Sequence, residues 1–244
     1  MLWPLGKRNF YILFSTGLQL ANSLNKPPLA PRKTRLSTTA TYILFCFSLA
    51  FYLGLAPWLE LNWGLWGVAL GQIFIFAIIP VGFAAFFPTP LKNIFPFRQI
   101  AFQELLWILL WSSLAIALAN LELNLQNRYW PLPQPEIKYY QKLLHHLNFL
   151  ELSKKLLILG LIPAFCEEIF FRGLIQSHLY GKFGMWLSTF LSGLLFSLAH
   201  FDLNYAVYFF ILGTFFAGCR HYRNNLAHPV LAHLLNNFYS LLNI

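Results

Sequence analysis

The chain has 244 residues, of which 58% are hydrophobic, 18% are aromatic and only 10% are charged. A soluble domain of this size cannot bury so many apolar side chains, so we expect lipid to surround much of the chain. The formal net charge of +9 would suit either nucleic acid or an anionic membrane surface. The basic residues fall between hydrophobic stretches and the sequence carries no nucleic-acid recognition motif, so we expect a lipid bilayer as partner and no nucleic acid.

The N-terminal half alternates between apolar and polar segments. Residues 10–24 form a short apolar stretch with several polar side chains, which predicts an interfacial or short N-terminal helix. Three later segments have the roughly 20 apolar residues that a helix needs to cross a bilayer; they are residues 40–59, 64–87 and 101–121. Residues 122–137 are polar and proline-rich, which predicts an exposed loop.

The C-terminal half starts with residues 137–151, where apolar positions recur at helical spacing beside lysines and histidines. This pattern predicts an amphipathic helix on the membrane surface. Four apolar helices are expected after it, at residues 155–179, 184–200, 203–220 and 226–243. The predicted fold is therefore all-α, a polytopic transmembrane bundle of about 7–8 helices, in which the eighth is residues 10–24 if they cross the bilayer.

We divide the chain into two parts at the proline-rich loop. Residues 1–136 hold the N-terminal transmembrane helices and this loop. Residues 137–244 hold the amphipathic helix and a C-terminal four-helix catalytic core.

The orientation prediction depends on the basic residues that precede the first clear span, namely Lys7, Arg8, Lys26, Arg32, Lys33 and Arg35. Because cytoplasmic loops carry an excess of Lys and Arg, they predict a cytoplasmic N-terminus for a multi-pass protein of the plasma membrane. Four lysines fall on the outer side in this scheme and weaken it, namely Lys138, Lys142, Lys154 and Lys155.

Two carboxylates and a guanidinium interrupt the apolar helix expected at residues 155–179. Such groups are costly inside a membrane, and they normally pair or line a polar cavity. Glu168 and Arg172 are i and i+4, so they share a helix face and can form an ion pair. Glu167 is rotated by about 100° and is left as a candidate general base. A purely structural Glu–Arg pair explains this helix equally well when it is considered alone.

Two further helices place polar groups at the same spacing. His200 ends one apolar helix and shares a face with Phe196, and His233 shares a face of the last helix with Asn237. A single intramembrane histidine is more often a hydrogen-bonded packing residue than a catalyst. Together, however, the three helices offer a carboxylate and a histidine to deprotonate water, and an imidazole and a carboxamide to stabilise an oxyanion. Peptide hydrolysis needs these two functions.

The motifs occur in the order Glu167-Glu168-x-x-x-Arg172, Phe196-x-x-x-His200 and His233-x-x-x-Asn237. In this order they resemble the CPBP family, the CAAX-processing and bacteriocin-processing (Abi) intramembrane proteases. The resemblance covers roughly residues 155–243, and the first half of the chain resembles no family that we can name.

The resemblance implies a compact bundle of transmembrane helices whose cavity opens to one side of the membrane and to lipid. It also implies the role of each motif residue: Glu167 and His200 activate water, Glu168 with Arg172 supports the site, and His233 and Asn237 stabilise the oxyanion.

The sequence leaves the metal content open. Glu167, His200 and His233 could supply three ligands to a catalytic zinc ion, with water as the fourth. The sequence has no HExxH motif, however, and water activated by a glutamate and a histidine needs no metal. We therefore expect no tightly bound zinc and keep these three residues as its ligands if one is present.

We accordingly expect an intramembrane endopeptidase that hydrolyses a peptide bond of a membrane-associated peptide or protein, either CAAX-like or a leader peptide. A nucleophilic role for Cys166, beside the glutamates, is disfavoured because a thiol in apolar surroundings forms little thiolate. The principal alternative is a noncatalytic membrane scaffold or immunity-type protein of the same fold, which would be expected to carry a broken motif. A small proton-coupled transporter is a third interpretation, but it predicts symmetry between the two halves, and the sequence shows none.

Overall fold

The computed structural model of the protein describes residues 37–145 and 148–242. Within these two ranges the chain forms helices and connecting turns, without strands, and the predicted all-α fold is confirmed. The helix expected at residues 10–24 lies outside the described residues.

The first two helices form a hairpin. Helix α2 (Thr38–Trp63) begins at Ser37, whose hydroxyl group accepts a hydrogen bond from the Ala40 backbone N–H. It ends at Gly64, whose φ of 58° is a left-handed conformation that glycine adopts without steric cost. The returning helix runs without interruption through α3 (Leu65–Ile73), the π-helical turn η1 (Phe74–Ile78) and α4 (Ile79–Ala85).

Helix α6 (Phe102–Tyr129) follows the short helix α5 (Leu91–Ile94) and is longer than the sequence indicated. The prediction of a loop at residues 122–137 is wrong at both ends, because residues 122–129 belong to α6 and residues 134–137 begin the next helix. Residues 122–129 contain neither proline nor glycine, and Leu, Glu and Gln favour a helix. The helix ends at Trp130, because the residue before a proline avoids the helical conformation.

The amphipathic helix expected at residues 137–151 is two helices in the structure, α7 (Gln134–Leu144) and α8 (Phe149–Lys155). Asn148 is the N-cap of α8, and its side chain accepts a hydrogen bond from the Glu151 backbone N–H.

A long, continuous helical segment then carries both glutamates of the motif. It runs from α8 through the π-helical turn η2 (Leu156–Leu161), α9 (Ile162–Glu168) and the π-helical turn η3 (Ile169–Ile175) into α10 (Gln176–Leu198). Gly184, with a φ of 77° and a ψ of −172°, breaks α10 and reverses the chain. The two π-helical turns in this segment, η2 and η3, flank α9. Turns of this kind are rare in proteins, and those that occur are frequently found at functional sites.

The last two long helices are α11 (Ala206–His221) and α12 (Ala227–Leu242), joined by the short 3-10 helix η4 (Tyr222–Asn224). The described ranges therefore hold seven long helical rods, as many as the spans expected from the sequence. The rods are residues 38–63, 65–85, 102–129, 149–183, 184–198, 206–221 and 227–242.

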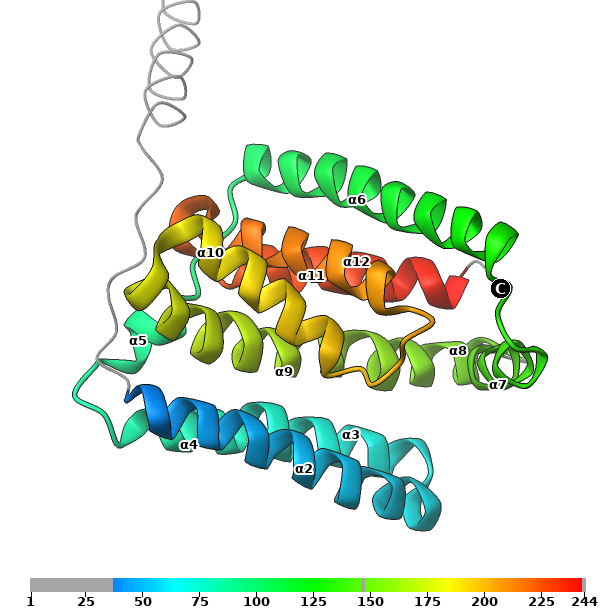
Figure 1. Cartoon of the computed structure of the whole chain (residues 1–244), viewed down its shortest axis with the longest axis horizontal. Helices are drawn as coiled ribbons and strands as arrows, with labels where there is room; N and C mark the ends of the chain where they lie inside the picture. Colours follow the sequence, from blue (N-terminus) through cyan, green and yellow to red (C-terminus); the bar gives the residue numbers. More distant parts are fainter. Residues whose placement is uncertain (1–36, 146–147, 243–244) are drawn as a thin grey trace, which may run out of the picture.

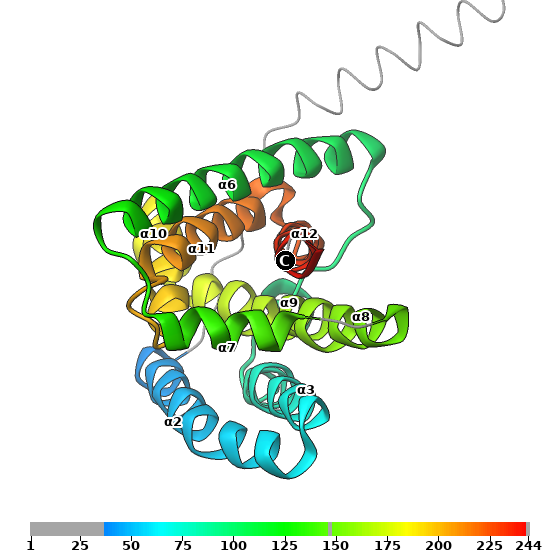
Figure 2. The same ribbon diagram turned by 90° about the vertical axis from the view of Figure 1, so that its right-hand side faces the viewer.

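The helices form a layered bundle (Figures 1 and 2). Helices α9, α10, α11 and α12 form a central group, with the α2–α3–α4 hairpin on one side of it and α6 on the other. Contacts between α3 and α9 join the hairpin to this group, and contacts with α11 and α12 join α6 to the same group from the opposite side. The centre of the bundle is packed with fully buried aromatic side chains, including Phe170, Phe171, Phe196 and Phe216.

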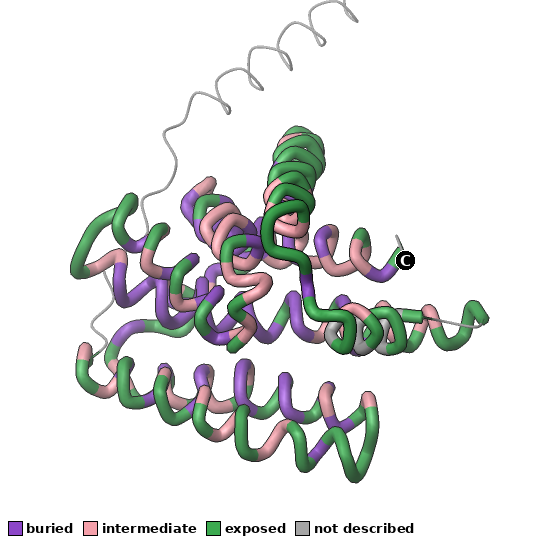
Figure 3. Tube along the Cα trace, turned by 45° about the vertical axis from the view of Figure 1, so that its right-hand side comes forward, coloured by how far each residue is buried: buried purple, intermediate pink, exposed green. Residues whose placement is uncertain are grey.

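The outer surface is strongly apolar. Figure 3 shows that α2 and α6 are mainly exposed along their outer faces, where many large hydrophobic side chains lie. Within the described residues, three helices are long and apolar enough to cross a membrane, namely Thr38–Trp63, Leu65–Ala85 and Phe102–Tyr129. Exposed apolar side chains on helices of this length indicate that lipid covers them.

Candidate active site

The adjacent residues Glu167 and Glu168 end α9 and point to different parts of the bundle. Successive residues of a helix are rotated by about 100°, so two neighbouring carboxylates cannot face the same partner. Glu167 meets α3, where it accepts a hydrogen bond from Gln72. Glu168 meets α12 and its own next turn, where it contacts His233 and Arg172.

Glu168 is the centre of a buried ionic network. Its Oε1 atom lies 2.8 Å from Nη1 of Arg172 and 2.9 Å from Nδ1 of His233. The side chains of Glu168 and Arg172 are both 0% exposed, so a direct partner must replace the water around each charge. The i, i+4 ion pair expected from the sequence is present.

Arg172 also connects this network to α11. Its Nη2 atom donates a hydrogen bond of 2.8 Å to the Gly213 carbonyl. The guanidinium carbon lies 4.5 Å from the centre of the Phe196 ring and 5.5 Å from that of Phe216. Aromatic faces attract a cation and do not compete with it for hydrogen bonds, which lowers the cost of burying the charge.

His233 is held in one orientation by Glu168 and by two aromatic rings. Because a carboxylate only accepts hydrogen bonds, the Nδ1 atom of His233 carries the proton in this contact. The imidazole stacks on Phe216 with 4.7 Å between ring centres and meets Phe196 edge to face at 5.7 Å. The contact with Glu168 leaves Nε2 as the ring atom available to another group.

Glu167 lines a small cavity of about 160 Å³ between α2, α3, α9 and the end of α10. Gln72 Nε2 donates a hydrogen bond of 3.1 Å to Oε1 of Glu167, whose residue is only 8% exposed. The second oxygen, Oε2, is buried and has no hydrogen-bond partner among the described residues. The other lining residues are Tyr52, Leu53, Phe76, Phe171, Ala199, His200 and Phe201.

His200 lines the same cavity from the end of α10. Its Nδ1 atom lies 2.8 Å from the Phe196 carbonyl, and a carbonyl can only accept, so Nδ1 is the donor. In the neutral imidazole Nε2 then carries the lone pair that a base needs. The ring stacks on Phe209 with 3.8 Å between centres, which fixes its plane.

The structure therefore places five of the six motif residues in two groups. Glu167 and His200 share the cavity, whereas Glu168, Arg172 and His233 form the ionic network. The Phe196 ring contacts both His200 and His233, so the two groups are neighbours.

Asn237 belongs to neither group. Its Nδ2 atom donates a hydrogen bond of 3.2 Å to the carbonyl of Gly160 in the π-helical turn η2. Neither Asn237 nor His233 is among the residues that line the cavity. A direct approach of these two side chains to a substrate at Glu167 therefore requires a rearrangement of the local contacts.

Gln72 is a site residue that the motifs did not reveal. It lies 95 positions before Glu167, in the half of the chain that resembles no family we can name. A signal was present nonetheless, because Gln72 is a lone carboxamide in a long apolar helix, and such polar groups usually face the interior of a bundle.

The sequence left Glu167, His200 and His233 as candidate ligands of a zinc ion. In the described part of the chain, no group of three or more His, Cys, Asp or Glu residues is arranged to hold a metal ion. The side chains as placed therefore do not fit a three-ligand zinc site, and we derive no step of the reaction through a metal.

Residues 150–239 match the model of a family described as type II CAAX prenyl endopeptidase Rce1-like. Because of this similarity, we call residues 150–239 the Rce1-like domain. No curated protein and no solved structure matches the chain.

The Rce1-like domain begins at the start of α8 and ends within α12, so it contains all six motif residues. The match is consistent with the CPBP family, and the resemblance inferred from the motifs is confirmed. It supports intramembrane protease activity in general. The α2–α3–α4 hairpin, which contributes Gln72 to the cavity, lies outside the Rce1-like domain.

Proposed function

We propose that this protein is an intramembrane endopeptidase that hydrolyses a peptide bond of a membrane-associated peptide or protein, either CAAX-like or a leader peptide. The observation that carries the proposal is the small cavity shared by Glu167 and His200, inside an Rce1-like domain. Both residues present to it an atom able to accept a proton, Oε2 of Glu167 and Nε2 of His200.

In the proposed reaction, a water molecule in the cavity donates hydrogen bonds to these two atoms. Glu167 removes one proton, and the resulting hydroxide attacks the carbonyl carbon of the scissile peptide bond. The proton is then delivered to the nitrogen of the leaving group, so that the products are a carboxylate and an amine. Gln72 holds the other oxygen of Glu167 and thereby directs Oε2 toward the water.

We further propose that His233 and Asn237 stabilise the oxyanion of the tetrahedral intermediate. Support comes from the hydrogen-bond donors that remain after their observed contacts. His233 donates Nδ1–H to Glu168, so its imidazolium form, paired with that carboxylate, carries a second N–H at Nε2 for the oxyanion, and Asn237 keeps one amide N–H beyond that given to Gly160. Both side chains reach the oxyanion after the rearrangement of local contacts described above. Glu168 and Arg172 act by positioning His233 within the bundle.

The test is cleavage of two fluorogenic peptides, one CAAX-type and one leader-type, by the purified protein in detergent. Glu167→Gln keeps the shape of the side chain and removes the base, and we expect kcat to fall by about 10²- to 10⁴-fold. His200→Ala should produce a loss of similar size. Cys166→Ala is the matched control, because Cys166 is the buried neighbour of Glu167 and has no part in the proposed reaction.

Loss of activity in Cys166→Ala together with full activity in Glu167→Gln would replace the proposed mechanism with thiol chemistry. If the wild type cleaves neither these peptides nor a library of membrane-associated peptides, while it remains folded, the noncatalytic scaffold or immunity-type protein would be the better interpretation.

A further inference from the structure

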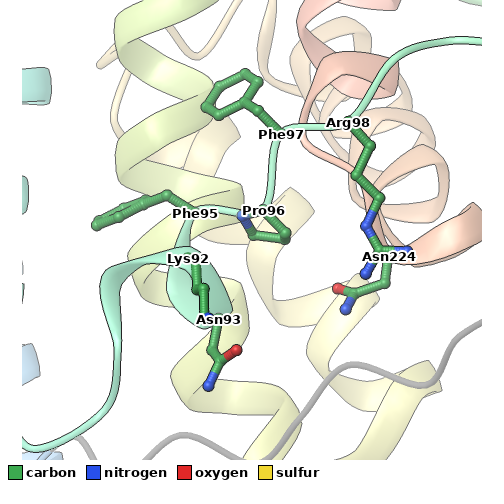
Figure 4. Close-up of a pocket in the computed structure, with 7 residues that line it drawn as sticks. All are labelled: Lys92, Asn93, Phe95, Pro96, Phe97, Arg98 and Asn224. Atoms are coloured by element: carbon green, nitrogen blue, oxygen red, sulfur yellow. The ribbon is translucent and has the colours of Figure 1, made fainter.

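A second polar pocket lies at the end of the bundle where α6 and α12 begin. It has a volume of about 450 Å³ and is lined by Lys92, Asn93, Phe95, Pro96, Phe97, Arg98 and Asn224. Figure 4 shows the Arg98 side chain running toward Asn224, with Lys92 and Asn93 on the other side of the pocket. None of these residues lines the cavity of Glu167, so the two sites are distinct.

Hydrogen bonds from distant segments hold the walls of this pocket. The Asn225 side chain accepts from the Arg98 backbone N–H at 3.0 Å and donates to the Arg98 carbonyl at 3.1 Å. The Leu226 backbone N–H donates to the Pro96 carbonyl at 2.8 Å. The loop after α5 is thus fixed to the connection between α11 and α12, and the pocket is preformed.

The pocket carries an excess of positive charge. Lys92 and Arg98 are exposed at its rim, and neither side chain forms an ion pair within the described residues. Glu104, an acidic residue near this end of the bundle, is already engaged by Arg223 and His228. An anion in the pocket would therefore face two cations without a competing carboxylate.

Arg220 adds a buried charge directly behind the pocket. It is only 2% exposed, and its guanidinium donates to the Asn224 carboxamide, which lines the pocket. Its Nε atom has no hydrogen-bond partner among the described residues, and the positive charge of Arg98 repels that of Arg220. Burying a cation beside another cation is costly unless an anion balances them.

The chemistry of these groups indicates what the anion is. Arginine side chains bind phosphate through several N–H groups at once, and lysine adds a point charge. Leu91 and Phe97, which flank the pocket, are 39% and 46% exposed, so apolar side chains adjoin it as at a membrane surface. Basic pockets between transmembrane helices bind the headgroups of anionic lipids.

We propose that this pocket binds a phosphate group, with the headgroup of an anionic phospholipid as its source. Lys92 and Arg98 contact the phosphate oxygens, and Arg220 contributes its charge through Asn224. The bound lipid fixes the loop after α5 and the connection between α11 and α12 at the membrane surface.

The test measures binding to the purified full-length protein in a neutral detergent by native mass spectrometry. The probes are dioleoylphosphatidylglycerol, dioleoylphosphatidylcholine and inorganic phosphate. We expect phosphatidylglycerol to bind in preference to phosphatidylcholine, and its Kd to rise about tenfold in Arg98→Gln and in Lys92→Gln, because each loses a charged hydrogen bond. Lys182→Gln is the matched control, since Lys182 carries the same charge at the same end of the bundle and does not line the pocket.

The results separate the sources of the phosphate group. If inorganic phosphate binds with the same dependence on Arg98 and Lys92 and phosphatidylglycerol does not, the site binds free phosphate. Equal affinities in the wild type and all three variants, or no binding of either phosphate compound, would overturn the proposal. Because the readout is binding, the result is independent of whether the protein cleaves peptides.

Discussion

At the scale of single residues, the main feature of the site is the different environment of two adjacent glutamates. Glu168 contacts a guanidinium and an imidazole, both through Oε1, and its Oε2 has no hydrogen-bond partner among the described residues. Glu167 has one neutral donor, Gln72, and one buried oxygen without a partner. The first arrangement favours a structural role, and the second favours proton transfer.

The contact between Gln72 and Glu167 leads to a prediction about turnover. Gln72→Met keeps the length of the side chain and removes the donor, so Glu167 loses the hydrogen bond that directs Oε2. We expect kcat for the cleaved peptide to fall about tenfold, the effect of one hydrogen bond to a charged group, while KM stays nearly unchanged. Steady-state kinetics on the purified variant provide the measurement, and a change confined to KM would contradict the positioning role.

The local part of this site was predictable from sequence, and the rest depended on the fold. The Glu168–Arg172 pair follows from i, i+4 spacing within one helix. The grouping of Glu167 with His200, and of Glu168 with His233, could not be read from spacing, because it depends on how separate helices rotate against each other. Gln72 was missed for the same reason, since its partner lies 95 residues away.

At the scale of elements, Arg172 joins three parts of the bundle. It lies in η3, pairs with Glu168 at the end of α9 and donates to the Gly213 carbonyl in α11. Through Glu168 it is also linked to His233 in α12. Helices α9, α11 and α12 of the central group therefore meet in one network around Arg172 and Glu168.

Removing this guanidinium should destabilise the protein strongly. In Arg172→Met the Glu168 carboxylate stays buried and loses its cation, and we expect the free energy of unfolding to fall by about 3–5 kcal/mol. Reversible unfolding in detergent is the measurement, with the exposed cation change Lys182→Met as control. The double variant Glu168→Gln with Arg172→Met should recover part of the loss, and the absence of any recovery would show that the charge is not the cause.

The packing of α10 on α11 depends on two glycines. A Cβ atom on Gly193 would lie 2.8 Å from the Thr214 backbone nitrogen, and one on Gly213 would lie 3.1 Å from the Gly193 carbonyl oxygen. Small residues let transmembrane helices approach closely, as these two do.

A methyl group at this contact should force the two helices apart. We expect Gly193→Ala to lower the free energy of unfolding by about 1–3 kcal/mol, the usual cost of overpacking. Gly218→Ala in α11 is the control, because a Cβ atom there meets nothing within 4 Å, and it should be neutral or slightly stabilising. Equal effects of the two changes, measured by the same unfolding experiment, would argue against close packing at Gly193.

The long apolar helices were predicted correctly, because their composition identifies them. The ends of helices with mixed composition were not. The spans expected at residues 40–59 and 64–87 correspond to the hairpin α2–α3–α4. The end of α6 was placed too early, because polar residues after position 121 looked like a loop, although only Pro131 stops the helix. Two of the described π-helical turns, η1 and η2, are each followed by a helix with a proline in its first turn, Pro80 and Pro163, which cannot donate a regular helical hydrogen bond.

At the scale of the whole molecule, charge is distributed unevenly between the two ends of the bundle. Figure 1 shows α5 at the end of the bundle where α2 begins, and the start of α12 lies there too. The segments at this end contain Lys92 in α5, Arg220 at the end of α11 and Arg223 in η4. The opposite end carries the end of α12, and acidic and basic residues are mixed there. From the positive-inside rule we therefore propose that the end with α5 faces the cytoplasm.

This orientation can be tested with reporter fusions in a bacterial host. Alkaline phosphatase, which is active only after export, should be active when fused behind Leu242 and inactive when fused behind Thr89. In the proposed arrangement, the C-terminal ends of α12 and α4 lie on opposite faces of the membrane. The reverse pattern would place the basic end outside and contradict the orientation.

The three π-helical turns in the described part of the chain affect how this architecture tolerates changes in chain length. Each such turn holds one residue more than a regular α-helical turn, and each lies near a site residue: η1 follows Gln72, η2 contains Gly160, and η3 follows Glu168. Deletion of one residue in η2 can restore regular winding, whereas deletion of one residue in the middle of α12 would rotate His233 by about 100°. Evolutionary insertions and deletions inside the transmembrane helices should therefore concentrate at these turns, where the length of the chain can change while the polar side chains keep their partners.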